Sequence, residues 1–377
     1  MSCKEIISAA ELAEFQIVSR SSRIGQYLAD ALYSELGIRL QVTKEILPEK
    51  RAIQIGIRPF CDYNGCRYGF RVERRSIYLD GGNEELLRQA ADLMLRSIAE
   101  EGCVKGNRYG YCWPEKAIHY GLRLNEQKQT AICEGVEFLR RSYVRSDGEP
   151  VEAFFVIAEP ESPTKAAVWG CPQGESMIVP EQVKWMRSLG ADVVAAVNAD
   201  FFHFFNNGDK TTFGAQIIDG TVYKEPSLVE HYGDNWFGMT ESGEYVMSDY
   251  NGYFSTYKGH LQCAVGGGVW LMREQMPVFH SSPAVEPRTA IAITRDGGLV
   301  MLCVDGRSEQ SVGATYTDLL QIFLELDIEL RSILNLDGGH STILMGKQAD
   351  GSMAILNNPS SGLDALRPVA DILTLVK

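Results

Sequence analysis

The sequence predicts an α+β protein, with a small N-terminal α/β domain over residues 1–120 and a larger, strand-rich α+β domain over residues 121–377. The chain has 377 residues, 45% of them hydrophobic, which is enough to bury cores in two domains. Residues 1–125 carry 18 basic and 16 acidic side chains, whereas the remainder carries 18 basic and 33 acidic, and this change favours a boundary near residue 120. Helical patterns frame the first part, whereas short apolar runs dominate the second.

The N-terminal part begins with an amphipathic helical pattern from Ile24 to Leu36, which Gly37 ends. A second helical pattern from Leu86 to Ile98 follows Asn83, a residue type that caps helices. Between them, apolar runs at 52–57, 68–72 and 77–79 predict strands, the last two forming a hairpin. The order of helix, strands and helix predicts a small α/β domain.

This N-terminal pattern resembles the small α/β domain that precedes the catalytic barrel in some hexosaminidases and α-glucuronidases. The resemblance rests on Tyr68-Gly-Phe-Arg-Val72 followed by Ile77-Tyr-Leu-Asp-Gly-Gly82. It implies a non-catalytic accessory domain, and no grouping of carboxylates or histidines between residues 1 and 120 requires another interpretation.

Short apolar runs in the second domain predict a strand-rich fold with two helices. The helical patterns lie at 180–189 and 317–326, and Thr315 or Thr317 is expected to cap the second of them. The predicted strands lie at 153–158, 166–169, 193–197, 215–218, 263–265, 291–293, 299–304, 332–336 and 342–345.

The composition excludes several classes of protein. A net charge of -13 disfavours long-range attraction to nucleic acid, and no run approaches the ~20 apolar residues that a membrane span requires. The first residues lack the pattern of a signal peptide, so the sequence predicts a cytoplasmic protein unless such a peptide has been removed, in which case the protein is secreted. Nine cysteines without a Cys-x-x-Cys pair predict reduced thiols and no zinc site. The oligomeric state stays open.

Polar residues follow the predicted strand at 193–197. Asn198 and Asp200 stand at its carboxyl end, where they either serve a site or only satisfy loop backbone. Three glycines at 266–268 permit close approach of the backbone to a ligand or to a neighbouring strand.

Two further groups of charged residues flank predicted strands. Arg288, followed by Thr289, is expected to hold a phosphate or carboxylate through its planar fork, with a structural salt bridge as the alternative. Asp305, Arg307 and Glu309 follow the strand at 299–304, where a plain polar turn would need only Asp305 and its glycine.

The segment from Asp337 to Thr342 carries the sharpest local signal. Gly338 and Gly339 allow successive backbone N–H groups to converge on an anion, while Ser341 and Thr342 add hydroxyl donors. His340 is expected to line the site or to move a proton, and no partner histidine stands at ligand spacing for zinc. A tight turn between strands is the alternative interpretation.

Together these motifs resemble the phosphodiester glycosidase family, which includes the mannose 6-phosphate uncovering enzyme and bacterial exopolysaccharide-associated domains. The resemblance covers roughly residues 130–377. His340 stands where the family commonly has a third glycine, and Ala199 stands where it commonly has a glycine. The motifs that carry the resemblance are 198–202, 266–268, 287–291, 304–307 with Gly313, 335–339 with Ser341 and Thr342, and 367–370.

The resemblance implies a hydrolase of carbohydrate metabolism that cleaves the anomeric C–O bond of a sugar-1-phosphodiester, of small-molecule or polysaccharide type, without a cofactor. Asp337 is favoured as nucleophile or base, and the sequence does not decide between retention and inversion. The catalytic candidates are Asp337, Arg288, Asp305, Asp200 and Glu309. The candidates for binding substrate or phosphate are Asn198, Gly267, Thr289, Arg307, Gly338, Gly339, His340, Ser341 and Thr342.

Two other classes of function stay open. A catalytically silent glycan-binding module would stack sugars on Trp236, Phe237 and the aromatic loop 201–205. A metal-assisted phosphodiesterase would use clustered aspartates with Mg²⁺ or Ca²⁺ and cleave P–O instead of C–O, although no motif indicates a divalent cation.

Overall fold

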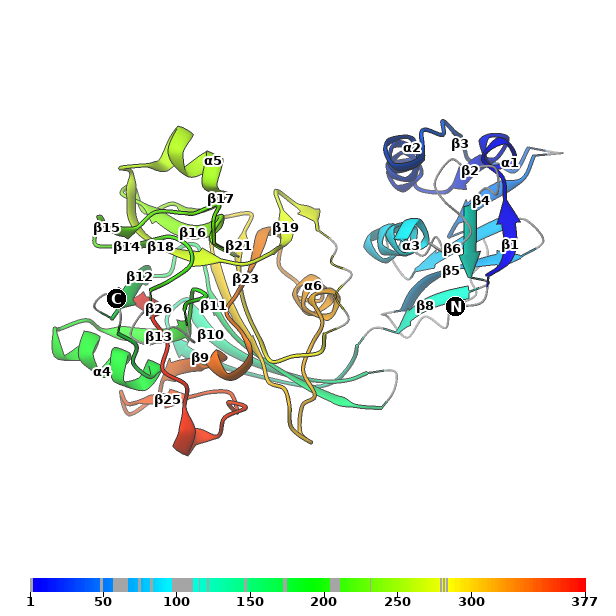
Figure 1. The fold of residues 1–377 in the computed structure, drawn as a ribbon. Helices are drawn as coiled ribbons and strands as arrows, with labels where there is room; N and C mark the ends of the chain where they lie inside the picture. Colours follow the sequence, from blue (N-terminus) through cyan, green and yellow to red (C-terminus); the bar gives the residue numbers. More distant parts are fainter. Residues whose placement is uncertain are drawn as a thin grey trace. The chain divides into compact units, whose positions relative to one another are not determined.

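The computed structural model of the 377-residue chain forms two compact units, Met1–Arg123 and Leu124–Lys377 (Figure 1). The elements within them confirm the predicted α+β class. The structure describes residues 3–47, 50–56, 67–73, 76–81, 84–96, 111–114, 116–120, 122–145, 148–171, 175–203, 211–230, 232–278, 280, 282 and 284–377. The predicted cap Asn83, the glycine Gly82, and the predicted helix and strand ends at Ile98 and Ile57 lie outside these residues.

The first unit is built on a six-stranded sheet in the order β3-β2-β4-β6-β5-β8, with β2, β3, β4 and β6 parallel. The predicted hairpin is confirmed, because β5 and β6 pair antiparallel. Helices α2 and α3 contact each other and cover the sheet, and Gly37 ends α2 at a φ of 71°. The bounds are β1 Cys3–Ile7, α1 Ala9–Ala13, β2 Gln16–Ser19, α2 Ser22–Leu36, β3 Gln41–Thr43, β4 Ala52–Ile55, β5 Arg67–Glu73, β6 Ser76–Gly81, α3 Glu84–Arg96, β7 Tyr111–Pro114 and β8 Lys116–Tyr120.

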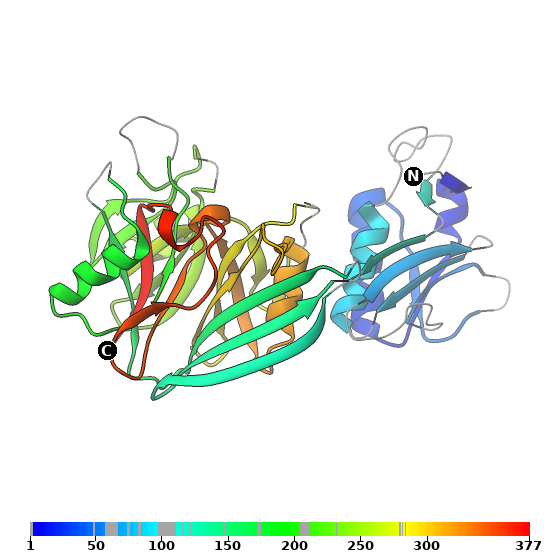
Figure 2. The same ribbon diagram turned by 90° about the horizontal axis from the view of Figure 1, so that it is seen from below.

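The second unit contains three sheets. The largest has eight strands in the order β20-β19-β23-β21-β22-β11-β10-β9, and Figure 2 shows β9, β10 and β11 as long adjacent strands at one of its edges. Its strands are β9 Arg123–Cys133, β10 Val136–Val144, β11 Pro150–Ala158, β19 Trp270–Arg273, β20 Met276–Pro277, β21 Arg288–Thr294, β22 Leu299–Val304 and β23 Leu330–Leu336.

Two five-stranded sheets complete this unit, in the orders β12-β26-β13-β24-β25 and β15-β14-β18-β16-β17. The strands of the first are β12 Lys165–Gly170, β13 Val193–Asn198, β24 Leu344–Lys347, β25 Met353–Ile355 and β26 Asp371–Val376. Those of the second are β14 Gln216–Ile218, β15 Thr221–Lys224, β16 Asn235–Thr240, β17 Tyr245–Asp249 and β18 Leu261–Gly267.

One hydrophobic core joins the three sheets. Val156 of β11 and Ile291 of β21 belong to the same buried cluster as Val197 of β13, Leu373 of β26 and Val265 of β18. Apolar side chains from strands far apart in sequence therefore leave water together, and this burial is the main force that holds the sheets in place.

Both predicted helices of the second unit are present, as α4 Val179–Ser188 and α6 Tyr316–Leu324. Thr315 caps α6 in a capping box, because its hydroxyl accepts the Asp318 N–H while the Asp318 carboxylate accepts the Thr315 N–H. Phe323 of α6 packs edge-on against Phe155 of β11 at 6.3 Å, so α6 lies on the eight-stranded sheet. A short helix, α5 Tyr250–Gly252, leads into a π-helical turn that the sequence pattern did not predict.

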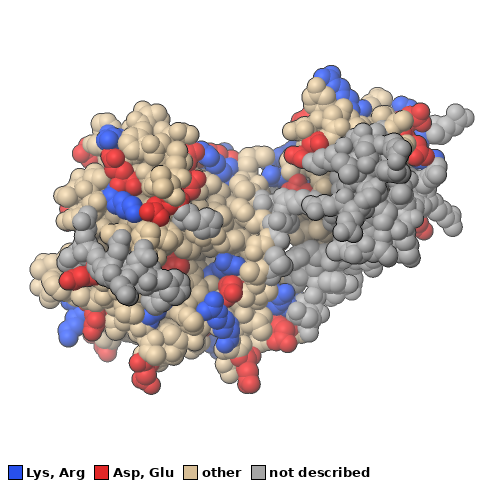
Figure 3. Space-filling model, viewed as in Figure 1, with Lys and Arg blue, Asp and Glu red and all other residues tan. Residues whose placement is uncertain are grey.

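Acidic and basic side chains alternate over the described surface in the view of Figure 3. This face carries no broad patch of one sign that would steer a polyanion. Among the described residues, no helix is both long and apolar enough to cross a membrane.

Candidate active site

The ends of four strands bring the predicted site residues to one edge of the second unit. Asn198 ends β13, and Arg288 begins β21 opposite Val304, the last residue of β22. Thr289 lies opposite Leu336, which ends β23 and precedes Asp337. Because neighbouring strands run antiparallel, the start of one and the end of the next meet at the same edge. Asn198 and Asp337, which are 139 positions apart, are neighbours here.

Asp337 is partly buried at this edge, and its backbone is fixed on both sides. Its N–H donates to the Ala199 carbonyl at 3.0 Å, and its own carbonyl accepts from the Asn198 side-chain amide at 2.6 Å. Burial raises the pKa of its carboxyl to about 6, while the Ser341 hydroxyl, the Arg367 guanidinium and the Gly338 N–H favour the anion. The site therefore contains a carboxyl poised to change charge near neutral pH.

Asn198, Thr289 and Thr342 were expected to bind substrate, but the structure buries all three behind Asp337. The Asn198 amide oxygen accepts from the Thr289 hydroxyl at 2.9 Å and from the Ile343 N–H at 3.1 Å. The Thr289 hydroxyl also lies 3.4 Å from that of Thr342. Since each of these side chains uses its polar atoms inside the protein, they position the Asp337 segment and do not face a ligand. Ser341 is also buried, next to the Asp337 carboxyl.

The turn at Gly338 and Gly339 differs from the predicted anion-binding arrangement of free N–H groups. The Gly339 N–H donates to the Pro287 carbonyl at 2.9 Å, and the N–H of Ser341 donates to the Gly338 carbonyl at 3.2 Å within a 3-10 turn, Gly339–Ser341. Gly338 is required for another reason, because a Cβ there would stand 2.7 Å from the Pro287 carbonyl oxygen. The glycines thus let the turn pack closely on the start of β21.

The glycines of 266–268 serve close packing between strands. A Cβ at Gly267, which was expected to contact substrate, would lie 2.5 Å from the Leu334 side chain, and one at Gly266 would lie 2.4 Å from the Asp200 carboxylate. Neither glycine has a positive φ, so space and not backbone conformation demands them.

Asp200 lies behind the site with a second carboxyl that the sequence pattern did not single out, Asp371 of β26. The Asp200 N–H donates to an Asp371 oxygen at 2.9 Å, and the Gly214 N–H donates to Asp200 Oδ2 at 2.8 Å. Burial, and next the charge of Asp371, hold the pKa of Asp200 well above its usual range; burial also raises the pKa of Asp371. Asp200 is 2% exposed, so its carboxyl is not placed to meet a ligand from solvent.

Arg288 is 9% exposed and its guanidinium is held by neutral partners, not by the structural salt bridge considered above. Nε donates to the Ala314 carbonyl at 3.0 Å and Nη2 to the Ala284 carbonyl at 2.9 Å, while the guanidinium stacks 4.2 Å from the centre of the Tyr316 ring. No described carboxylate pairs with it. Arg288 therefore keeps its full positive charge in a fixed orientation at the site edge.

Arg307 lies on the other side of the Gly338–Gly339 turn. It adopts a φ of 61°, Nε donates to a Glu286 oxygen at 2.7 Å, and Nη2 forms an ion pair with the same oxygen at 2.7 Å. Nη1 lies 3.4 Å from the His340 ring, which is exposed. Glu309 is exposed in the same loop and belongs to none of these contacts among the described residues. It does not join the other catalytic candidates.

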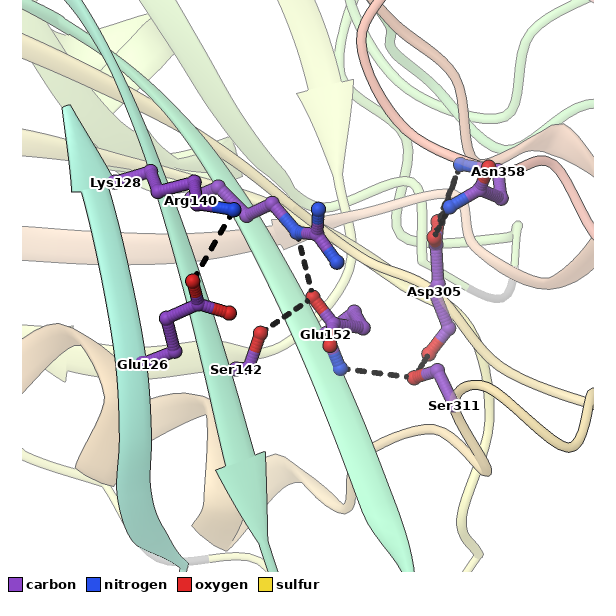
Figure 4. Close-up of polar contacts among 8 residues, drawn as sticks. All are labelled: Glu126, Lys128, Arg140, Ser142, Glu152, Asp305, Ser311 and Asn358. Atoms are coloured by element: carbon purple, nitrogen blue, oxygen red, sulfur yellow. Dashed lines mark hydrogen bonds and ion pairs between the residues drawn. The ribbon is translucent and has the colours of Figure 1, made fainter. Parts of the chain in front are cut away.

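Asp305 clamps a neighbouring loop and is not available as a nucleophile (Figure 4). One oxygen accepts from the Asn357 amide at 2.9 Å. The other accepts from the Asn358 N–H at 2.9 Å and its side-chain amide at 3.0 Å, as Figure 4 shows. Its backbone carbonyl accepts from the Ser311 hydroxyl, which in turn accepts from the Glu152 N–H. All of these bonds connect β22 to the 357–358 turn and to β11.

Replacing Asp305 with alanine should lower the free energy of unfolding by about 2 kcal/mol, because the buried Asn357 amide and the donors of the exposed Asn358 lose their acceptor. We do not expect a larger loss of stability, because burial raises the pKa of the Asp305 carboxyl to about 6 and the ionised form is therefore already disfavoured. Urea denaturation at pH 7 measures the change. Glu309→Ala, which removes an exposed carboxylate from the same loop, is the matched control, and equal stability of both variants would refute the clamp.

Two of the aromatic residues expected to stack on sugars are not available for that use. Trp236 and Phe237 of β16 are both fully buried, and the Trp236 N–H donates to the Asp249 carbonyl. Phe204 and Phe205 of the predicted aromatic loop lie outside the described residues. Phe201 stacks on Tyr232 at 4.5 Å.

Arg367 and Asp371 join the site although they were not among the candidates. Arg367 favours the charged form of Asp337 and stacks on Phe202 at 5.2 Å. Its motif, Arg367-Pro-Val-Ala370, was a signal that could have identified it. Asp371 follows directly and has no local pattern of its own. Among the described residues, no group of three or more His, Cys, Asp or Glu side chains is placed to hold a metal ion.

Comparison with known proteins gives a match for most of the second unit. The family model described as phosphodiester glycosidase matches residues 191–376. This part of the chain belongs to the phosphodiester glycosidase family. The matched region contains Asp337, Arg288, Arg307 and the two residues missed from the sequence, Arg367 and Asp371.

Individual relatives are distant. A SPbeta prophage-derived uncharacterized protein of Bacillus subtilis, YomE, is 29% identical over 191 residues, which is 48% of this chain and 28% of that protein. The chain thus spans about a quarter of this curated relative. The catalytic domain of zebrafish N-acetylglucosamine-1-phosphodiester α-N-acetylglucosaminidase, auto-inhibited by its pro-peptide, has a TM-score of 0.48 and 17% identity, covering 67% of this chain and 88% of that one. A hypothetical protein from Synechocystis has a TM-score of 0.45 and 14% identity, covering 71% and 69%.

Proposed function

We propose that the second unit hydrolyses the anomeric C–O bond of a sugar-1-phosphodiester, such as an N-acetylglucosamine-1-phosphodiester, and releases the free sugar and a phosphomonoester. The observation that carries the proposal is Asp337, a partly buried carboxyl with a pKa raised to about 6 at an edge that also holds Arg288 and Arg307. Membership of residues 191–376 in the phosphodiester glycosidase family supports the reaction class.

The chemistry of the leaving group determines which roles the site residues must fill. A phosphomonoester leaves as a weakly basic anion, so protonation by a general acid matters less than in an ordinary glycosidase. The oxocarbenium-like centre needs a carboxylate, which either attacks it or activates water. Of the carboxyl candidates, Asp200 and Asp305 are buried and engaged, and Glu309 is exposed away from the network, which leaves Asp337. Arg288 stabilises the charge that develops on the phosphate.

The pH dependence of turnover tests the role of Asp337. Because burial raises its pKa to about 6, Asp337 is protonated and inactive below that value and ionised above it. We therefore expect kcat/KM to rise with pH between about 5 and about 7 and then to level off. Arg367→Gln removes a charge that favours the carboxylate, so the rise should move to higher pH in this variant. A rise centred near pH ~4, the usual range of aspartate, would contradict the assignment.

The reaction itself is tested by release of reducing sugar from UDP-N-acetylglucosamine and related sugar-1-phosphodiesters in H₂¹⁸O. Cleavage at the anomeric carbon places ¹⁸O in the sugar, as expected. Label in the phosphate, with loss of activity on addition of a chelator, would instead establish a metal-assisted phosphodiesterase. Saturable glycan binding without turnover would establish a binding module.

A further inference from the structure

The exposed rim beside Asp337 contains two nitrogen-bearing side chains, Arg307 and His340, which we call the rim pair. Arg307 is oriented by Glu286, one oxygen of which accepts from Nε at 2.7 Å and forms an ion pair with Nη2 at 2.7 Å. Its Nη1 is 3.4 Å from the nearer ring nitrogen of His340. The side chain of Arg307 is 40% exposed, so the guanidinium can meet a ligand from solvent.

The backbone around Arg307 is shaped to hold it there. Arg307 has a φ of 61°, a conformation that non-glycine residues adopt at a cost and keep where surrounding contacts fix it. Gly339 has a φ of 63°, which favours glycine, and a Cβ there would be in ordinary contact with Arg307 Nη2 at 3.4 Å, so the guanidinium lies beside this turn. The Arg307 N–H donates to the Val312 carbonyl at 3.2 Å, which closes its loop.

The turn that follows Asp337 connects it to the rim pair. Gly338 follows Asp337 and packs on Pro287 and the backbone of Arg288, Gly339 lies against the Arg307 guanidinium, and His340 comes next in an exposed position. A leaving group that departs from a sugar at Asp337 along this turn would pass the start of β21 first and Arg307 second. The backbone of Arg288 thus lies beside Gly338, and the guanidinium of Arg307 lies beside Gly339, one residue farther from Asp337.

We propose that the rim pair binds a second phosphate of the leaving group, so that this chain prefers sugars linked through a diphosphate to sugars linked through a single phosphodiester. The inference rests on the proposed function and names the substrate class of the same site. Arg307 offers Nη1 to the outer phosphate, and a guanidinium binds phosphate oxygens through charge-assisted hydrogen bonds. His340 stands beside it as a second donor, which a glycine at this position would not provide.

Two substrates that differ by one phosphate test this inference. They are UDP-N-acetylglucosamine and the phosphodiester that joins N-acetylglucosamine 1-phosphate directly to the 5′ oxygen of uridine. Wild-type protein should have the higher kcat/KM on the diphosphate. Arg307→Ala should lower that value by about 10- to 100-fold, the range of one to two charge-assisted hydrogen bonds, and the single-phosphate substrate should lose much less.

His340→Gly should reduce the preference for the diphosphate substrate and leaves the Arg307–Glu286 pair in place. It therefore provides a second test if Arg307→Ala folds poorly. Arg295→Ala, which removes an exposed arginine paired with Glu329 at 3.0 Å at the far end of β21, is the matched control and should keep the wild-type preference. Equal losses on both substrates in the rim variants would overturn the second-phosphate assignment alone. Failure of wild-type protein to cleave either substrate would overturn the proposed function and this inference with it.

Discussion

Replacing Asp337 with asparagine should lower kcat by about 10²- to 10⁴-fold, the range that a positioned acid or base contributes. Asparagine has the same shape and can still lie beside Ser341 and Arg367, but it carries no negative charge. At pH 7 the wild-type carboxyl is mainly ionised, because its pKa is about 6. The substitution therefore removes the anion that faces the oxocarbenium-like centre and leaves the surrounding contacts in place. Initial rates on UDP-N-acetylglucosamine at pH 7 measure the loss.

Asp350→Asn is the matched control for this substitution. Asp350 is exposed in the turn between β24 and β25, and its side chain accepts from the N–H and the hydroxyl of Ser352. It should behave as wild type in both turnover and thermal unfolding. If Asp337→Asn kept full turnover while folded, the negative charge would have to come from another carboxylate, and the proposed site would be wrong.

The strands that support this site could be predicted because their residues form continuous buried apolar runs. The run at 299–304 is β22 residue for residue, and that at 193–197 is β13 with Asn198 added. Such a run depends only on burial of both faces of the strand, so local sequence is enough to detect it. For the same reason, the polar residues that follow each run could be placed at the strand ends.

The roles of individual polar residues could not be predicted in the same way. A motif places Asp305 and Asp337 at equivalent strand ends, yet Asp305 is engaged by the 357–358 turn and Asp337 is partly exposed. This difference arises from partners more than fifty residues away from Asp305. Similarly, Asp371 becomes a site residue only because β26 pairs with β13, which brings it to Asp200.

The burial of two aromatic residues could not be predicted from the sequence either. Trp236 and Phe237 are adjacent residues of β16, a strand with neighbours on both sides in its sheet, and both of their side chains are buried. Adjacent residues of a strand point to opposite faces, so burial of both requires cover on each face of the sheet. Phe237 belongs to the core shared by the three sheets, and Trp236 to a smaller cluster with Tyr253. The turn after α5, which covers Trp236, had no clear signal in the sequence.

Replacing Arg288 with alanine should lower kcat/KM by about 10²- to 10³-fold, or ~2.7–4 kcal/mol, as for loss of a donor that stabilises developing charge. The guanidinium has no carboxylate partner among the described residues, so its charge is not neutralised within the site. Fixed donors of this kind cost no reorganisation when charge develops on the leaving phosphate. Rates on UDP-N-acetylglucosamine, normalised to folded protein, measure the effect.

The same substitution should also destabilise the fold, because the Ala314 and Ala284 carbonyls lose their donors and the Tyr316 ring loses its stacked partner. We expect a loss of about 1–3 kcal/mol in the free energy of unfolding, so the domain remains folded. Arg288→Lys separates the two effects: lysine keeps the charge but not the planar fork, and it should recover part of the rate. If turnover per folded molecule stays at the wild-type value in Arg288→Ala, the role of Arg288 is only structural, as a contact between α6 and β21. If Arg288→Ala lowers turnover and Arg288→Lys recovers part of it, the charge of Arg288 is needed at the site of cleavage.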